Sequence, residues 1–99
     1  MGPDGYPDDQ ELKRIQEWPV EDFRGLMEFV LSLWWHPEYI RQTTPRRFLV
    51  STAGWSGNES IISALQLNTM FWLICWQESR RGGHYKFELP KLTTKTTVP

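Results

Sequence analysis

Met70-Phe71-Trp72-Leu73-Ile74-Cys75-Trp76 is the longest unbroken apolar run of this 99-residue chain, and its conformation decides the fold. It is too uniformly apolar to be an element with one exposed face. Such a uniformly apolar run is typical of a central strand that is covered. We therefore predict a strand over residues 71–77. One of its faces packs under helices, and the other needs a cover from this chain or from a second molecule.

A hairpin follows this run. Arg80-Arg81-Gly82-Gly83 is a turn sequence, and beyond it Tyr85, Phe87 and Leu89 alternate with polar residues, which predicts a half-exposed strand.

Upstream of the run, Ser56-Gly57-Asn58-Glu59 fits the S-x-x-E capping box, with Ser56 and Glu59 as the structural cap of a helix over residues 57–67. Residues 47–52 are β-prone and predict a strand. Residues 36–46 contain two prolines and predict a loop.

Two helices precede that loop. Asp8 or Asp9 can cap a short helix over residues 9–17. Pro19 begins a stronger helix, in which apolar residues recur at helical spacing from Phe23 to Trp34.

The predicted order is therefore α-α-β-α-β-β. We expect an α+β fold, a small two-layer sandwich with helices on one face of a three-stranded, mostly antiparallel sheet. Residues 9–89 form one domain, residues 1–8 and 90–99 are flexible tails, and six Trp, five Phe and three Tyr supply large core side chains.

Composition excludes several classes of protein. The net charge of −1 argues against a globally basic nucleic-acid binder, and the apolar run is far shorter than the roughly 20 residues that span a bilayer, so we expect no membrane partner. A single cysteine forms no internal disulfide, and the start lacks a secretory signal, which favours the cytoplasm. Cys75, with two distant histidines, predicts a buried thiol rather than a catalytic, metal or cofactor site.

Two sequence features exceed what folding requires. Trp55 and Asn58 are not explained by helix capping, and an exposed Trp beside a helix start is a typical partner anchor. Arg80, Arg81 and His84 surround the hairpin turn, where guanidinium groups suit carboxylates or phosphates. The alternative is that these five residues serve only turns and solvation.

A resemblance to known proteins rests on four motifs: Gly-Trp-Ser-Gly-Asn-Glu at 54–59, Phe71-Trp72, Cys75-Trp76 and Arg-Arg-Gly-Gly-His-Tyr at 80–85. In these motifs the chain resembles small bacteriophage-encoded proteins, notably those of actinobacteriophages. This family has no assigned activity.

The resemblance implies a non-catalytic accessory protein in the cytoplasm of an infected bacterial host. We expect it to bind a host protein, as inhibitors of defence systems such as anti-CRISPR proteins do, through the five residues singled out above. The alternative is a nucleic-acid-binding accessory protein, in which Arg46, Arg47 and Lys86 join the hairpin arginines on phosphates. A homodimer is compatible with either interpretation.

Overall fold

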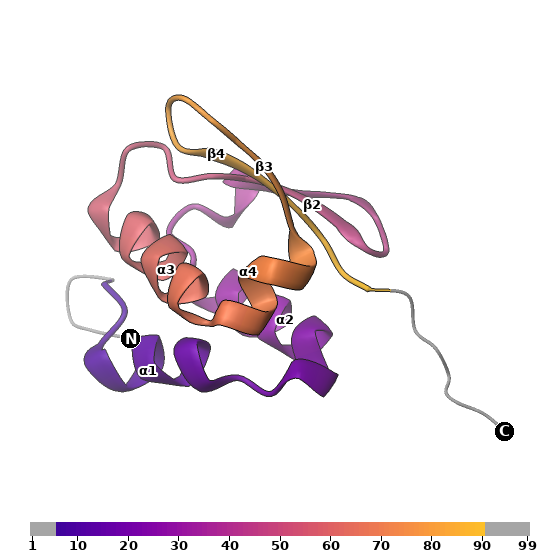
Figure 1. Cartoon of the computed structure of the whole chain (residues 1–99). Helices are drawn as coiled ribbons and strands as arrows, with labels where there is room; N and C mark the ends of the chain where they lie inside the picture. Colours follow the sequence, from indigo (N-terminus) through magenta and orange to yellow (C-terminus); the bar gives the residue numbers. More distant parts are fainter. Residues whose placement is uncertain (1–5, 91–99) are drawn as a thin grey trace, which may run out of the picture.

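Helices cover one side of a four-stranded antiparallel sheet in the computed structural model of this chain, which describes residues 6–90 (Figure 1). The chain order is α-α-β-β-α-α-β-β. The predicted α+β class is confirmed, whereas the three strands and the predicted order are wrong.

The elements in chain order are α1 (Asp9–Glu17), η1 (Val20–Asp22), α2 (Phe23–Leu33), η2 (Pro37–Tyr39), β1 (Ile40–Thr44), β2 (Arg47–Ser51), α3 (Ser56–Leu67), α4 (Thr69–Cys75), β3 (Trp76–Arg80) and β4 (His84–Glu88).

The two N-terminal helices begin at acidic caps. The Asp8 carboxylate accepts a hydrogen bond from the Glu11 amide at 2.8 Å, and the Glu11 carboxylate accepts one from the Asp8 amide at 2.9 Å, which completes a capping box. The second helix starts later than predicted, because Pro19 to Asp22 form a 3-10 turn and the Asp22 side chain caps α2. Residues 9–17 are helical as predicted.

The predicted loop over residues 36–46 is wrong, because it contains strand β1. β1 pairs antiparallel with β2, with Arg41 opposite Leu49, and Pro45-Arg46 connect the two strands. Nearly all residues of β1 are exposed to solvent, so the segment lacks the alternation of apolar and polar residues that would have identified a strand.

The predicted strand over residues 71–77 is also wrong: α4 ends at Cys75 and β3 begins at Trp76. Phe71 and Cys75, four residues apart, are fully buried on one side of α4, while Leu73 is 75% exposed on the other. Hydrophobicity alone could not separate these sides, because both carry apolar residues.

The helix α3 does not use the predicted capping box. Trp55 is its N-cap residue, Ser56 is already helical, and no side chain caps this end. The Ser56 hydroxyl instead pairs with the Tyr6 hydroxyl at 3.1 Å. The capping box is absent because a tight turn precedes the helix, in which the Trp55 amide donates to the Thr52 carbonyl at 3.0 Å. The helix therefore starts at Ser56, one residue earlier than predicted.

The core lies between the helices and the inner face of the sheet. Phe71 of α4 meets Phe23 of α2 edge to face at 5.3 Å and Phe87 of β4 at the same centroid distance. The other fully or nearly buried hydrophobic residues of this core are Ile15, Leu26, Met27, Val30, Leu33, Trp34, Phe48, Val50, Ile61, Ile62, Ala64, Leu65, Cys75 and Leu89.

The predicted tails fall largely on residues 1–5 and 91–99, outside the described residues. Within the described part of the N-terminal tail, Tyr6 stacks on Trp55 at 4.8 Å and Asp8 caps α1.

Asn68, at the corner between α3 and α4, is a buried polar connection between three helices. Its side-chain oxygen accepts from the Phe71 amide at 3.1 Å and so caps α4. Its amide group donates to the carbonyls of Ile15 and Trp18 at the end of α1, at 2.9 and 3.2 Å. These bonds satisfy backbone groups that the helix ends would otherwise leave unpaired.

We predict that Asn68→Ala lowers the free energy of unfolding by about 2 to 3 kcal/mol, because it removes a cap and leaves carbonyls of α1 without their donor. Ser56→Ala is the control, since no cap is lost there, and it should cost less than about 0.5 kcal/mol. Urea denaturation of both variants decides the matter, and equal losses would contradict this account of the two helix starts.

Candidate functional site

The outer face of the sheet, turned away from the helices, carries a row of side chains that crosses all four strands. Residues directly opposite each other in antiparallel strands share a face. Arg41 of β1 lies opposite Leu49 of β2, Leu49 opposite Lys86 of β4, and Lys86 opposite Glu78 of β3. The row therefore combines one apolar and three charged side chains.

A hollow of ≈ 620 Å³ lies over this row, open to solvent. Tyr39 and Leu49 provide apolar surface and are 46% and 36% exposed. Arg80 and His84, opposite each other in β3 and β4, contribute to its wall. The remaining lining residues are Glu38, Arg41, Val50, Ser51, Glu78, Tyr85 and Lys86.

Glu78 is the central carboxylate of this surface. Its side chain accepts a hydrogen bond from the Arg80 guanidinium, and Lys86 Nζ lies 3.5 Å from its other oxygen. The Arg80 contact, with a smaller effect of Lys86, holds the pKa of Glu78 below its ordinary value. Glu78 thus partly neutralises the positive charges of Arg80 and Lys86.

A second carboxylate, Glu88, neutralises the arginines at the other end of the sheet. Arg47 Nε lies 3.0 Å from Glu88 Oε1, and Arg46 Nη2 lies 3.4 Å from Glu88 Oε2. The predicted phosphate contacts Arg46, Arg47 and Lys86 are therefore each in an ion pair with a glutamate.

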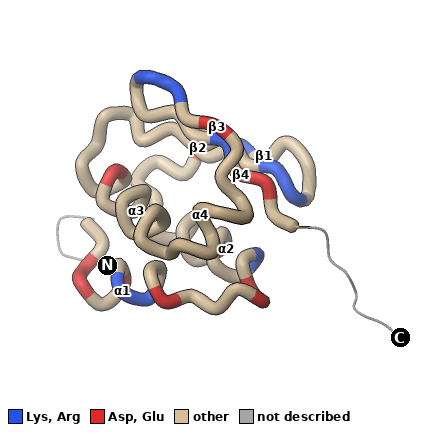
Figure 2. Tube along the Cα trace, in the orientation of Figure 1, with Lys and Arg blue, Asp and Glu red and all other residues tan. Residues whose placement is uncertain are grey.

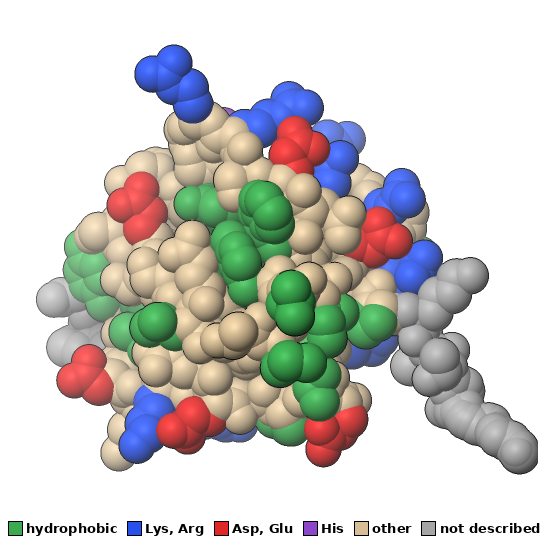
Figure 3. All heavy atoms as spheres, viewed as in Figure 1, with side chains coloured by type: hydrophobic (Ala, Val, Ile, Leu, Met, Phe, Trp, Pro, Cys, Tyr) green, Lys and Arg blue, Asp and Glu red, His purple; other side chains and the backbone are tan. Residues whose placement is uncertain are grey.

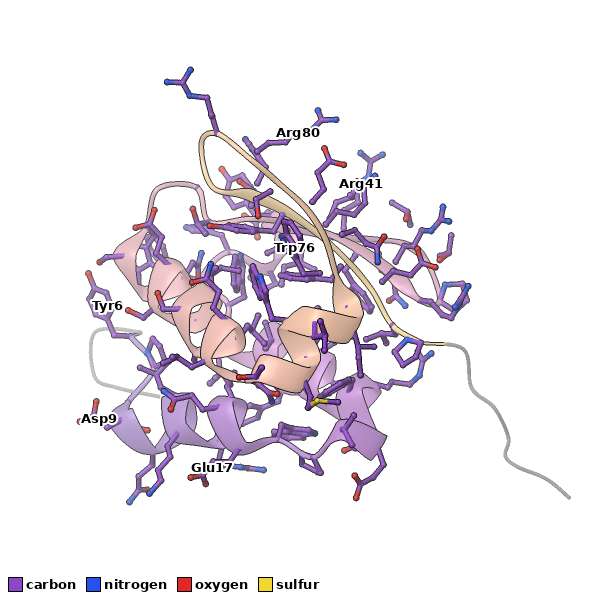
Figure 4. All side chains as sticks on the ribbon, in the orientation of Figure 1. Tyr6, Asp9, Glu17, Arg41, Trp76 and Arg80 are labelled. Carbon is purple, nitrogen blue, oxygen red and sulfur yellow. The ribbon has the colours of Figure 1, made fainter. Side chains whose placement is uncertain are left out.

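The Arg41 side chain differs from these cations, because it makes no hydrogen bond or ion pair within residues 6–90, although its backbone belongs to the β1–β2 pair. The imidazole of His84, a residue of β4, likewise has no polar partner in that range. Figure 4 shows Arg41 and Arg80 on the sheet side of the molecule, opposite Asp9 and Glu17 of α1. In Figure 2 the basic residues gather along the sheet and its hairpins, while much of the acidic charge lies along α1 and the segment that follows it.

The hairpin turn and the Trp55 turn, which the sequence could not place relative to each other, are neighbours. The Thr52 amide donates to the Gly83 carbonyl at 3.0 Å, immediately beyond the last pair of β2 and β4. Gly83 has φ +80°, and a Cβ there would collide with the Thr52 hydroxyl. Arg81 lies at the tip of this turn and does not line the hollow.

Trp55 belongs to a row of aromatic rings in contact, of which the Tyr6–Trp55 pair is stacked and the others are tilted or edge to face. Its ring lies between Tyr6, at 4.8 Å, and Trp35, at 4.7 Å. Trp35 meets His36 at 4.3 Å, and His36 meets Tyr39 at 6.2 Å. The row thus runs from the N-terminal segment to the edge of the hollow, where Tyr39 belongs to both.

Asn58 is fully buried and cannot contact a partner at the surface. Its side-chain oxygen accepts from the Trp35 amide at 2.9 Å, and its amide donates to the carbonyls of Trp35 and Thr52 at 3.1 and 3.3 Å. Its role is to hold the segment after α2 and the turn after β2 against the start of α3.

Sequence reasoning missed Tyr39, Arg41 and Leu49, which line the hollow. Tyr39 and Arg41 fell in the predicted loop, where the signals for a strand are the β-prone pairs Tyr39-Ile40 and Thr43-Thr44. Leu49 was in the predicted strand, but its exposed face follows only from the register.

Cys75 is buried, as predicted, although it lies at the end of α4 and not on a strand. Desolvation raises the pKa of its thiol to about 12, which opposes formation of a nucleophilic thiolate. Among residues 6–90, no group of three or more His, Cys, Asp or Glu side chains is placed to hold a metal ion. None of the helices in that range has the length and apolar character needed to cross a membrane.

Comparison with known proteins gave no match to a family model, to a curated protein or to a solved structure.

We predict that Gly83→Ala destabilises the protein more than Gly54→Ala does. Both glycines have a left-handed φ, which costs other residues about 1 to 2 kcal/mol, but only at Gly83 would the new Cβ meet another side chain. The added collision and the weakened Thr52–Gly83 bond should cost about 1 kcal/mol more. Thermal unfolding measures both, and an equal shift would contradict the close approach of the two turns.

We also predict that the Cys75 thiol reacts with a disulfide reagent at pH 8 at least about 100-fold more slowly in the native protein than in urea, because burial removes both access and thiolate. Absorbance of the released thiolate follows the reaction. Rapid native labelling would reopen a nucleophilic role for Cys75.

Proposed function

We propose that this chain is a non-catalytic binding module whose outer sheet face binds an acidic segment of another protein. The observation that carries the proposal is the hollow of ≈ 620 Å³, in which Tyr39 and Leu49 are surrounded by Arg41, Arg80 and Lys86. Apolar surface within a charged and polar surround is the usual anatomy of a protein interface, and Tyr and Arg are the residues most often responsible for its affinity.

Charge supports an acidic partner. The hollow is lined by three basic side chains, Arg41, Arg80 and Lys86, and by two carboxylates, Glu38 and Glu78, so positive charge is in excess. The Arg41 side chain, which has no polar partner among residues 6–90, offers its planar guanidinium to a carboxylate without first breaking an ion pair. Of the hairpin residues, Arg80 and His84 belong to this surface, and Trp55 contributes by supporting the exposed Trp35 beside it.

The same charges disfavour nucleic acid as the ligand. A phosphate backbone binds where cations are free to replace its counterions. Here Glu78 lies between Arg80 and Lys86, and Glu88 lies between Arg46 and Arg47, so the basic groups alternate with carboxylates that would repel phosphates. A nucleic-acid-binding accessory role is the second interpretation, and salt dependence separates the two.

The resemblance to phage proteins supports a host protein as the partner, in the cytoplasm of an infected bacterium. A component of a defence system such as CRISPR fits this interpretation, because an inhibitor of this kind acts by occupying a surface and needs no catalytic group. The neutral Cys75 thiol agrees with a non-catalytic role.

The prediction is that Arg41→Ala combined with Arg80→Ala lowers partner affinity at least about 30-fold, while the melting temperature changes little, because both side chains are at the surface. Lys13→Ala, on α1 at the opposite side, is the control for loss of a positive charge. The partner is captured from infected cells with the tagged chain, purified and titrated calorimetrically against each variant.

Two outcomes would contradict the proposal. One is a captured protein that binds the double variant as tightly as it binds the parent. The other is binding to DNA or RNA oligonucleotides of any sequence that falls log-linearly with salt, which indicates phosphate contacts. Arg81→Ala adds a further distinction, since the tip of the turn lies outside the hollow and should contribute little.

A further inference from the structure

A second surface, on the helical side of the molecule, is apolar and exposed. We call it the α4 face and define it by Leu67, Met70, Leu73, Ile74 and Trp76. Leu73 is 75% exposed and Leu67 64%, the largest values among the large hydrophobic residues of the described chain. Leu73 and Ile74 are three and four positions after Met70 on α4 and so lie beside it on the helix surface, while Leu67 ends α3 just before this helix and Trp76 begins β3 just after it.

The α4 face carries no charge. Residues 60–77 contain no Asp, Glu, Lys, Arg or His, and this stretch runs from the second turn of α3 through α4 to the start of β3. Figure 3 shows hydrophobic side chains in the middle of this face, with acidic and basic side chains around its edge. Single exposed hydrophobic residues are ordinary, but a contiguous uncharged patch marks an interaction surface.

We propose that the α4 face is the contact between two copies of this chain, which pack α4 against α4 about a two-fold axis. In such a contact the same patch meets itself, so any net charge within it would be repelled by its own copy. An uncharged apolar patch meets this condition without needing a complementary surface. A helix that binds an anionic membrane surface would instead carry Lys and Arg beside its apolar side, and α4 carries none.

The helix, and not the neighbouring sheet edge, makes this contact. β3 is an edge strand, and its first residue, Trp76, belongs to the α4 face. Pairing of β3 with its own copy about the middle of the strand would set Glu78 opposite the second Glu78, which like charge disfavours. Charged residues of this kind protect edge strands from further pairing.

The dimer extends the proposed binding function without depending on it. The hollow lies on the outer face of the sheet, and the α4 face lies on the helical side, so packing two copies through α4 leaves both hollows open. The dimer would therefore present two equivalent binding surfaces, which raises avidity for a partner that displays two acidic segments.

Light scattering coupled to size-exclusion chromatography tests the dimer. Over loading concentrations from about 1 to about 200 µM, the mass of the full chain should rise from 11.7 kDa toward twice that value. Leu73→Glu should raise the dissociation constant at least about tenfold, because it places a carboxylate from each copy at the contact.

Leu31→Glu is the matched control. Leu31 is an exposed leucine of α2 outside the α4 face, so its substitution should leave the mass profile unchanged. Circular dichroism at about 1 µM checks that both variants fold, as expected for substitutions of exposed side chains.

Three results would overturn the proposal. The first is a mass of one chain at every concentration, and the second is equal weakening by Leu31→Glu and Leu73→Glu. The third concerns the chain's own C-terminal segment as the cover: a chain truncated after residue 90 would dimerise while the full chain stays monomeric. Loss of the dimer leaves the Arg41 and Arg80 test unaffected, so the two proposals fail separately.

Discussion

Two buried asparagine side chains, one at each end of α3, are the interactions on which the rest of the structure depends. Asn58 binds backbone groups of Trp35 and Thr52, and Asn68 binds those of Ile15, Trp18 and Phe71. Each amide satisfies polar groups in segments that lack a regular ladder of their own, where an unpaired group would be costly. Consistent with this, no buried side-chain nitrogen or oxygen among residues 6–90 lacks a partner.

These polar connections position both surfaces of the molecule. Asn58 fixes the turn after β2, whose Thr52 meets Gly83 and so brings the hairpin beside Trp55. Asn68 ends α3 and starts α4, which turns Phe71 into the core and Leu73 outward. The outer sheet face and the α4 face thus follow from side chains that neither face exposes.

The two surfaces differ in chemistry, and this difference suggests a division of roles. The outer sheet face combines Tyr39 and Leu49 with ion-paired and unpaired cations, which suits a partner that has to be discriminated. The α4 face has no charge to set register or exclude other proteins. We infer specific recognition on the first and self-association on the second, which keeps the apolar patch of a small domain away from nonspecific contacts.

The sequence by itself determined the helices whose apolar residues recur on one side, the hairpin made by Gly82-Gly83 and the α+β class, because local spacing and turn chemistry encode them. It could not determine that residues 71–75 form a helix, since a run that is apolar throughout has no visible period. Nor could it show β1, whose exposed residues are held by pairing with β2. Only the tertiary structure placed Arg41, Leu49 and Lys86 in one row and buried Asn58, because strand register and long-range hydrogen bonds join residues that are distant in the chain.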